Sequence, residues 1–186
     1  MDNAAIQNVV LDDADECARF IDQHRSEIAE GRYDLRIEKD LVRTLSDEDL
    51  LLLARSCPSS RQTIALVVKS PAVLEFLACD SSSDVREAAG DNTRTPSGTL
   101  EKLADDPSSS VRMAAASNAN TPESTLEKLS RDSINYVRWG VANNERTPAA
   151  VLKSLAKDLD GHVRREAKNN PNCPKPGLFA RLMGRS

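Results

Sequence analysis

A Val-Arg pair recurs along this chain at a fixed step of 26 residues, and this repeat constrains the fold more than any other feature. A fixed period between about 20 and 50 residues is typical of stacked arrays, in which each unit covers the apolar face of its neighbour. The chain is therefore expected to be a repeat protein. The four pairs are Val85-Arg86, Val111-Arg112, Val137-Arg138 and Val163-Arg164.

Other residue types keep the same step and define the repeat more closely. A Thr-Pro pair and a leucine recur once per unit, and so do one aspartate and one asparagine. The Thr-Pro pairs begin at Thr95, Thr121 and Thr147, and the leucines are Leu100, Leu126, Leu152 and Leu178. The aspartates are Asp80, Asp106, Asp132 and Asp158, and the asparagines are Asn92, Asn118, Asn144 and Asn170.

Each unit is predicted to contain two helical pieces, and residues 95–120 show the first one best. Thr95 is interpreted as an N-cap whose hydroxyl accepts a free amide hydrogen, with Pro96 at the first helical position. Leu100 and Leu103 follow at helical spacing. Pro107 ends this piece, because the residue before a proline is driven out of the α region.

The second piece is expected to be the shorter one. Residues 108–110 are interpreted as a turn with a second N-cap, and residues 111–116 as one or two helical turns, either a brief α-helix or a 3₁₀ turn. Asn118 is expected to close the unit at a helix end or tight turn, because asparagine tolerates left-handed geometry. The buried Leu and Val side chains of one unit cannot offset its ordering entropy, so the units must stack.

The pattern Thr-Pro-x-x-x-Leu-x-x-Leu-Ala-x-Asp, followed by Val-Arg and Asn, resembles the leucine-rich repeat variant family of bacteria. The resemblance covers about residues 70–180. It implies a HEAT-like right-handed α-solenoid of alternating α and 3₁₀ helices, and no particular activity. Some members carry an iron–sulfur module on clustered N-terminal cysteines. Here only Cys17 and Cys57 precede the array, so that cluster is not expected.

The repeat also predicts the organisation of the chain. Residues 1–49 lack it and are expected to form an all-helical N-terminal cap, with helices over 11–28 and 35–45. Residues 50–180 form the predicted array, in which 50–70 is a degenerate unit without the Val-Arg pair. Complete units are expected to begin near 70, 95, 121 and 147, with a partial unit from 173 and a tail over 181–186. Arg181 replaces a leucine of the repeat, as suits a terminal unit facing water.

The arginine column Arg86, Arg112, Arg138 and Arg164 has a functional and a structural interpretation. As a basic stripe it could bind a phosphate backbone or an acidic peptide. Alternatively, each arginine pairs with an aspartate of its own or a neighbouring unit. Equal numbers of Arg and Asp in fixed columns favour the structural interpretation. We therefore expect Arg, Asp and Asn of the repeat to maintain the stack.

Binding residues are expected at positions that differ between units. The residue after the column arginine is Glu87, Met113, Trp139 and Arg165 in turn, and the residue before the valine is Asp84, Ser110, Tyr136 and His162. Trp and Tyr are enriched at binding hot spots, and the chain has a single Trp. Met113, Tyr136, Trp139, His162 and Arg165 are therefore the candidate partner-binding residues. The alternative is that Trp139 packs against the adjacent unit beside Gly140.

No constellation for catalysis, metal or cofactor binding is found in the sequence. His24 and His162 lack a neighbouring nucleophile, and no Gly-rich phosphate loop, HExxH or GxSxG occurs. The adjacent acids at 12, 13, 15 and 16 are interpreted as a solvated helix start and not a calcium loop. The four cysteines have no metal-like spacing and are expected to be reduced thiols.

The sequence favours a non-enzymatic scaffold or adaptor that binds another protein, without cofactor, in the bacterial cytoplasm. The alternative is a nucleic-acid-binding solenoid that uses the arginine column, which the net charge of −4 disfavours. A third alternative is a purely structural domain. No secretory signal or membrane span is predicted. Acids predominate over 1–70 and bases over 153–186, so head-to-tail self-association is left open, as are the partner and pathway.

Overall fold

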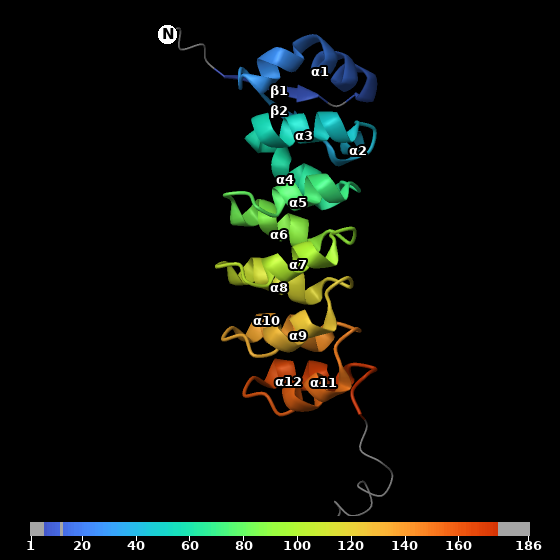
Figure 1. Cartoon of the computed structure of the whole chain (residues 1–186), viewed down its shortest axis with the longest axis vertical. Helices are drawn as coiled ribbons and strands as arrows, with labels where there is room; N and C mark the ends of the chain where they lie inside the picture. Colours follow the sequence, from blue (N-terminus) through green and yellow to red (C-terminus); the bar gives the residue numbers. More distant parts are fainter. Residues whose placement is uncertain (1–5, 12, 175–186) are drawn as a thin grey trace, which may run out of the picture.

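The computed structural model describes residues 6–11 and 13–174, and it shows a column of helical layers stacked in chain order (Figure 1). The predicted partial unit from 173 with Leu178 and Arg181, and the tail over 181–186, fall mainly or wholly outside the described residues. Each layer from residue 71 onward consists of a first and a second helix. The predicted helical solenoid of paired repeats is therefore confirmed.

The first helices have seven residues each and the second helices nine. The first helices are α5 (Pro71–Leu77), α7 (Ser97–Leu103), α9 (Glu123–Leu129) and α11 (Ala149–Leu155). The second helices are α6 (Ser83–Asp91), α8 (Ser109–Ser117), α10 (Asn135–Asn143) and α12 (Gly161–Asn169). No 3₁₀ segment occurs in the described part of the chain, so the brief α-helix is the alternative that is found.

The second helix is longer than predicted because the preceding turn is very short. The Oδ1 atom of Asp106 accepts the amide hydrogen of Ser108 at 2.8 Å, which closes the turn in three residues. The helix then begins at Ser109, inside the stretch that was expected to be the turn. Ser108 occupies the N-cap position without a side-chain capping bond.

The predicted capping role of Thr95 was wrong. The Thr95 side chain is fully buried, and its hydroxyl donates to the carbonyl oxygen of Ala89 at the end of the preceding second helix. Pro96 is the N-cap, in extended geometry (φ −62°, ψ 147°), and its carbonyl accepts from the amide of Leu100. Thr121 and Thr147 make the same bond. The threonine column therefore joins the second helix of each layer to the start of the first helix in the next layer.

The second helices pack directly against one another along the column, and small residues make this approach possible. A Cβ atom added to Gly90 of α6 would lie 2.9 Å from the Cβ of Ala114 on α8. Two adjacent apolar clusters together run from the cap to Ala167. Buried Leu and Val side chains of both helices of each unit supply most of the burial, at roughly 1.5–3 kcal/mol each.

The N-terminal cap is not all-helical, contrary to the prediction. It contains β1 (Gln7–Leu11), α1 (Ala14–Ala29), β2 (Tyr33–Ile37) and α2 (Lys39–Val42). The two strands are parallel, with Val9 opposite Leu35. Residues 35–37 alternate buried, exposed and buried, which is the period of a strand and not of a helix. Gly31, with φ of 74°, makes the turn that separates α1 from β2.

The degenerate unit over 50–70 forms a helix pair that packs like the later layers. Its helices are α3 (Asp47–Ser56) and α4 (Pro58–Val67). Helix α3 contacts α5, and α4 contacts α6 and strand β2. The first complete layer is therefore covered by this pair, and the pair in turn by the mixed α/β cap. None of the helices in the described residues is long and apolar enough to cross a membrane.

Candidate functional site

The arginines of the repeat form a ladder of ion pairs between consecutive layers. The Nε and Nη2 atoms of Arg112 donate to the two carboxylate oxygens of Asp132 in the next layer, at 2.6 and 3.1 Å. Its Nη1 atom donates to the carbonyls of Asp106 and Pro107 in its own layer. The pairs Arg86–Asp106 and Arg138–Asp158 have the same geometry. Each of the three nitrogen atoms of these guanidinium groups thus donates at least one hydrogen bond.

The electrostatics of the ladder match this geometry. Burial opposes the ionisation of Asp106, but hydrogen bonds from Arg86 and from the Ser108 amide outweigh it, so the pKa of Asp106 is lowered. The side-chain hydrogen bond to Asp106 in turn raises the pKa of Arg86. Each pair is therefore held in its charged form at neutral pH. A ladder that is neutralised in this way offers little free positive charge to an anionic ligand.

The asparagines of the repeat form a second, fully buried ladder. The Nδ2 atom of Asn144 donates to the carbonyls of Ala116 and Asn118 in the previous layer, at 2.8 and 2.9 Å. Its Oδ1 atom accepts the amide hydrogen of Arg146. Asn144 is the C-cap of α10, so this column lies at the helix end as expected, but its backbone is extended (φ −69°, ψ 125°) and not left-handed. Asn92, Asn118 and Asn170 make the corresponding bonds.

The ladder extends one layer beyond the residues that the repeat identified. Arg61 on α4 donates to Asp80, with its Nη1 atom 3.2 Å from Oδ2, and to the carbonyl of Ala54. The repeat did not identify Arg61, because Arg61 lies 25 and not 26 residues before Arg86 and because Ser60 replaces the valine of the Val-Arg pair. At the other end Arg164 donates to the carbonyls of Asp158 and Leu159. Position 184, where the aspartate column would continue, is Gly184.

The candidate partner-binding residues lie on the row of second helices. Tyr136 of α10 is 42% exposed, and its hydroxyl shares a hydrogen bond with Ser109 of the preceding layer. Met113 and Trp139 are partly buried and pack against the core of the array. His162 and Arg165 on α12 are exposed. Because α8, α10 and α12 pack side by side, these residues belong to a single face, which we call the second-helix face.

Trp139 packs against the core, as one of the two interpretations of the sequence expected, and it is only partly buried. The neighbouring Gly140 brings α10 close to α8, since an added Cβ would lie 3.0 Å from the Ser117 hydroxyl and 3.1 Å from the Ala116 Cβ. The indole is therefore fixed partly by packing and partly open to solvent.

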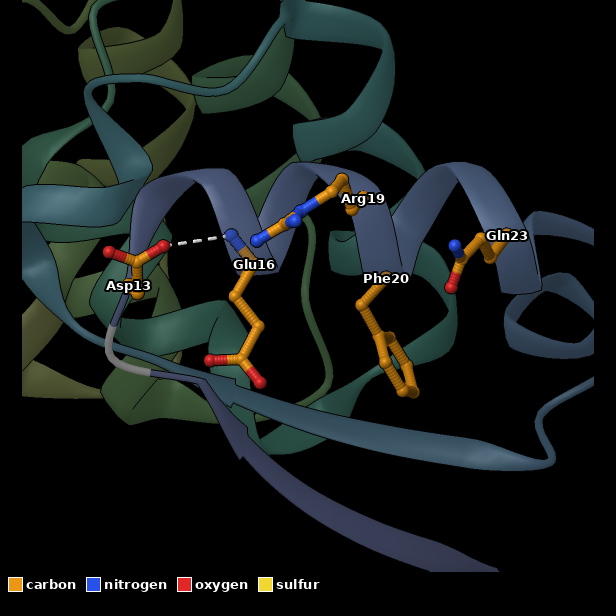
Figure 2. A pocket seen from close by; sticks show the side chains of 5 residues that line it. All are labelled: Asp13, Glu16, Arg19, Phe20 and Gln23. Carbon is orange, nitrogen blue, oxygen red and sulfur yellow. Dashed lines mark hydrogen bonds between the residues drawn. The ribbon is translucent and has the colours of Figure 1, made fainter.

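A pocket in the cap lies beside α1, above strands β1 and β2 (Figure 2). It has a volume of about 530 Å³ and is lined by Asp13, Glu16, Arg19, Phe20 and Gln23. Asp13 caps α1 by accepting the amide hydrogen of Glu16, and Arg19 donates to a backbone carbonyl of its own helix. The acids are therefore a helix start, although Asp12 of that cluster lies outside the described residues. No pair of side chains here suggests a nucleophile and base.

The histidine and the cysteines of the cap are in structural surroundings. His24 hydrogen-bonds Glu27, and its ring packs at a tilt against Phe20 and Tyr33. Burial raises the pKa of the Cys17 thiol to about 11, and it also raises the pKa of Cys57. Both are thus held as neutral thiols. Among the residues that the structure describes, no group of three or more His, Cys, Asp or Glu side chains could hold a metal ion.

The repeated helix pairs and their inter-layer ladders define an α-solenoid. The structure is similar to a solved structure described as a leucine-rich repeat variant with a novel repetitive protein structural motif, with 26% sequence identity and a TM-score of 0.56. The match covers 77% of this chain and 62% of that protein. The chain therefore has the leucine-rich repeat variant fold, as the resemblance implied. No family model matches the sequence, and no curated protein matches it.

Proposed function

We propose that this protein is a non-catalytic adaptor whose second-helix face binds another protein. The observation that carries the proposal is that the second helices contain two kinds of position, one constant and one variable. Residues that recur in every layer are engaged in the ladders, whereas the residues beside them change from layer to layer and reach solvent. An array with a constant frame and variable surface positions suits protein recognition.

The composition of that face supports a protein partner. It carries the single tryptophan of the chain and the exposed Tyr136, which are the residue types that dominate interface hot spots. The buried core of the array is built mainly from Leu, Val and Ala, whereas Tyr136 is exposed and Trp139 is only partly buried. Exposed aromatic surface on one row of packed helices therefore favours a binding role.

The nucleic-acid alternative has less support. It required free guanidinium groups in the arginine column, and Arg86, Arg112 and Arg138 are each paired with an aspartate. The second-helix face also begins with acidic residues, Asp84 and Glu87 on α6, which would repel a phosphate backbone.

The proposal is tested by capturing partners from a lysate of the source cells, with nuclease added to half of each sample. Wild type is compared with Tyr136→Ala and Trp139→Ala. Phe76→Ala is the matched control, because Phe76 is an aromatic residue 38% exposed on the first helix α5. We expect a protein that survives nuclease, is retained by the control and is lost with both face variants.

Two results would count against an adaptor. Equal loss with Phe76→Ala would mean that the face has no special role. Recovery of nucleic acid that dissociates as salt is raised would support the alternative function instead.

A further inference from the structure

The second-helix face carries a gradient of charge along the column. Its first helix, α6, presents Asp84, Glu87 and Asp91, of which the two aspartates are exposed. Its last described helix, α12, presents Arg165 and His162 in the same columns, and both are exposed. The acidic and basic ends are thus separated by the whole length of the repeat array (Figure 1).

The helices between these ends present uncharged side chains in the same two columns. They are Ser110 and Met113 on α8, and Tyr136 and Trp139 on α10. Met113 and Trp139 both rest on the core, so they form a fixed apolar centre. The charged side chains Arg94 and Arg146 belong to the turns after α6 and α10 and not to these columns. Along the columns the order is therefore acidic, apolar and basic.

The charged groups at the two ends are not used to hold the fold together. Within the described residues, no ion pair involves Asp84, Glu87, Asp91 or Arg165, in contrast with the arginines and aspartates of the ladder. Exposed charges that make no structural contact remain available to a ligand of opposite charge. The sequence repeat alone pointed to the variable columns but did not reveal that their charges are ordered.

From this order we propose that the second-helix face binds an extended peptide segment with basic residues at one end, an aliphatic or aromatic side chain in the middle and acidic residues at the other end. The basic end would lie on α6, the apolar side chain against Met113 and Trp139, and the acidic end on α12. This inference rests on the proposed adaptor function and specifies its partner.

The spacing of the helices sets the length of the segment. Packed helices lie about 8–10 Å apart, so the three steps from α6 to α12 span roughly 24–30 Å. An extended chain covers about 3.3 Å per residue, so the charged ends of the ligand are separated by roughly eight residues. A helical ligand would need about twice as many residues for the same span, because its rise is about 1.5 Å per residue.

Fluorescence titration of the full chain tests the proposal directly, since Trp139 is the only tryptophan and lies at the centre of the face. The probes are peptides of about ten residues without aromatic side chains, with Lys-Lys at one end, Leu in the middle and Glu-Glu at the other. The set contains both chain directions, a version with Gln at both ends, and versions with Lys or Glu at both ends. We expect a graded peptide to bind at least about tenfold more tightly than the Gln version, with affinity that falls as salt rises.

A charge reversal on the protein provides the second arm. Asp84→Lys with Glu87→Lys should make the peptide with Glu at both ends the preferred ligand. The matched control is Glu75→Lys with Glu101→Lys, which changes the net charge equally but on the exposed surface of the first helices α5 and α7. The control should keep the preference of the wild type for the graded peptide.

Several results would overturn the proposal, and they are distinguishable from failure of the adaptor function. Equal affinity for the graded and the Gln peptides would leave an adaptor with an apolar specificity. No change in Trp139 emission with any peptide would reject the extended ligand, while capture from lysate would still test the adaptor. A third result would assign the face to a second copy of this chain. In sedimentation at low salt, the wild type would form a dimer that the graded peptides do not dissociate, and the Asp84→Lys, Glu87→Lys protein would not form it.

Discussion

At the scale of single residues, the polar side chains that recur in each layer bind to a neighbouring layer and also hold the turns of their own. Asn144 satisfies two carbonyls of the previous layer and one amide of its own. Threonine and arginine of the repeat work in the same way. Each layer is therefore fastened to the next by buried polar bonds as well as by apolar contact, and a substitution in such a column should weaken an interface between layers.

Replacement of Asn144 by alanine should lower the free energy of unfolding by about 2–3 kcal/mol, because two buried carbonyls and an amide lose their partner. Its neighbour Asn143 has an exposed side chain and is the matched control, with an expected change within about 0.5 kcal/mol. Urea unfolding followed by circular dichroism measures both. Equal effects of the two substitutions would show that the buried amide bonds do not hold the layers together.

The ladder also predicts a pH dependence. The pKa of Asp106 is lowered in the folded protein from the ordinary value of 3.8. Its contribution is therefore complete above that value and is lost as pH falls through the lowered folded pKa. At pH 7 Asp106→Asn should cost about 1–3 kcal/mol, because Arg86 loses a charged acceptor while the bond from the Ser108 amide can persist.

The difference in unfolding free energy between wild type and Asp106→Asn should shrink steadily below about pH 4. Asp105→Asn is the control, since the Asp105 side chain is 66% exposed and pairs only with an exposed lysine, Lys128. It should change stability by less than about 1 kcal/mol at any pH. A constant difference for Asp106→Asn between pH 7 and pH 3 would contradict the assignment of its stabilisation to charge.

Sequence reasoning located these residues but assigned some of them the wrong contacts. Thr95 was interpreted by a local rule as a helix cap, which is wrong, whereas Asn118 does lie at the helix end where it was expected, although its contacts with the neighbouring layer were not anticipated. Their actual partners, Ala89 for Thr95 and Gly90 and Asn92 for Asn118, depend on how layers stack. The pairing of Arg with Asp was easier to anticipate, because two columns of opposite charge with the same period place an arginine and an aspartate at the same relative position in every layer.

At the scale of helices and strands, contact between successive second helices decides which residues are allowed. Gly90 and Gly98 illustrate the point, since both lie in helices but in different surroundings. A Cβ atom on Gly90 would meet Ala114 of α8 at 2.9 Å, whereas a Cβ atom on Gly98 of α7 would meet nothing within 4 Å. The same substitution is therefore expected to have opposite signs at the two positions.

Gly98→Ala should stabilise the protein by up to about 1 kcal/mol, because alanine is the better helix former. Gly90→Ala gains the same propensity but forces α6 and α8 apart, and overpacking of this kind costs about 1–3 kcal/mol, so the net effect should be destabilising. Thermal unfolding of the two variants beside wild type measures the signs. A gain in stability from both would mean that α6 and α8 can separate without cost.

The cap was the part of the fold least accessible from the sequence. Residues 35–37 are too few for their alternation to be distinguished from a helical pattern. Strand β2 also forms only by pairing with β1, which lies 26 residues earlier in the chain. The length of the second helix was underestimated because the Asp106 side chain closes the preceding turn through the amide of Ser108. The turn is therefore shorter than expected, and the helix begins earlier. The candidate face, by contrast, followed directly from the repeat, since positions that share a column must share a side of the stack.

At the scale of the whole molecule, the protein is a one-dimensional array in which a layer touches only its neighbours. Among the elements that the structure describes, those of the cap lie at the opposite end of the column from the last repeats and make no substantial contact with them (Figure 1). Stability in such an array is approximately a sum of layer and interface terms, so damage at one end need not reach the other. The cysteines report on this, since Cys17 is buried in the cap and Cys173 packs partly against the last described layer.

Leu152→Ala in α11 should therefore act locally. Leu152 is fully buried, and its truncation is expected to cost about 2–5 kcal/mol. Labelling of thiols under native conditions should become much faster at Cys173 and change little at Cys17, because only the last layers open. Ile21→Ala, at a fully buried position of α1, is the reciprocal control and should accelerate Cys17 alone. If either substitution accelerated the labelling of both thiols by the same factor, the layers would open as one cooperative unit. Damage to one layer would then also disrupt the second-helix face in the other layers.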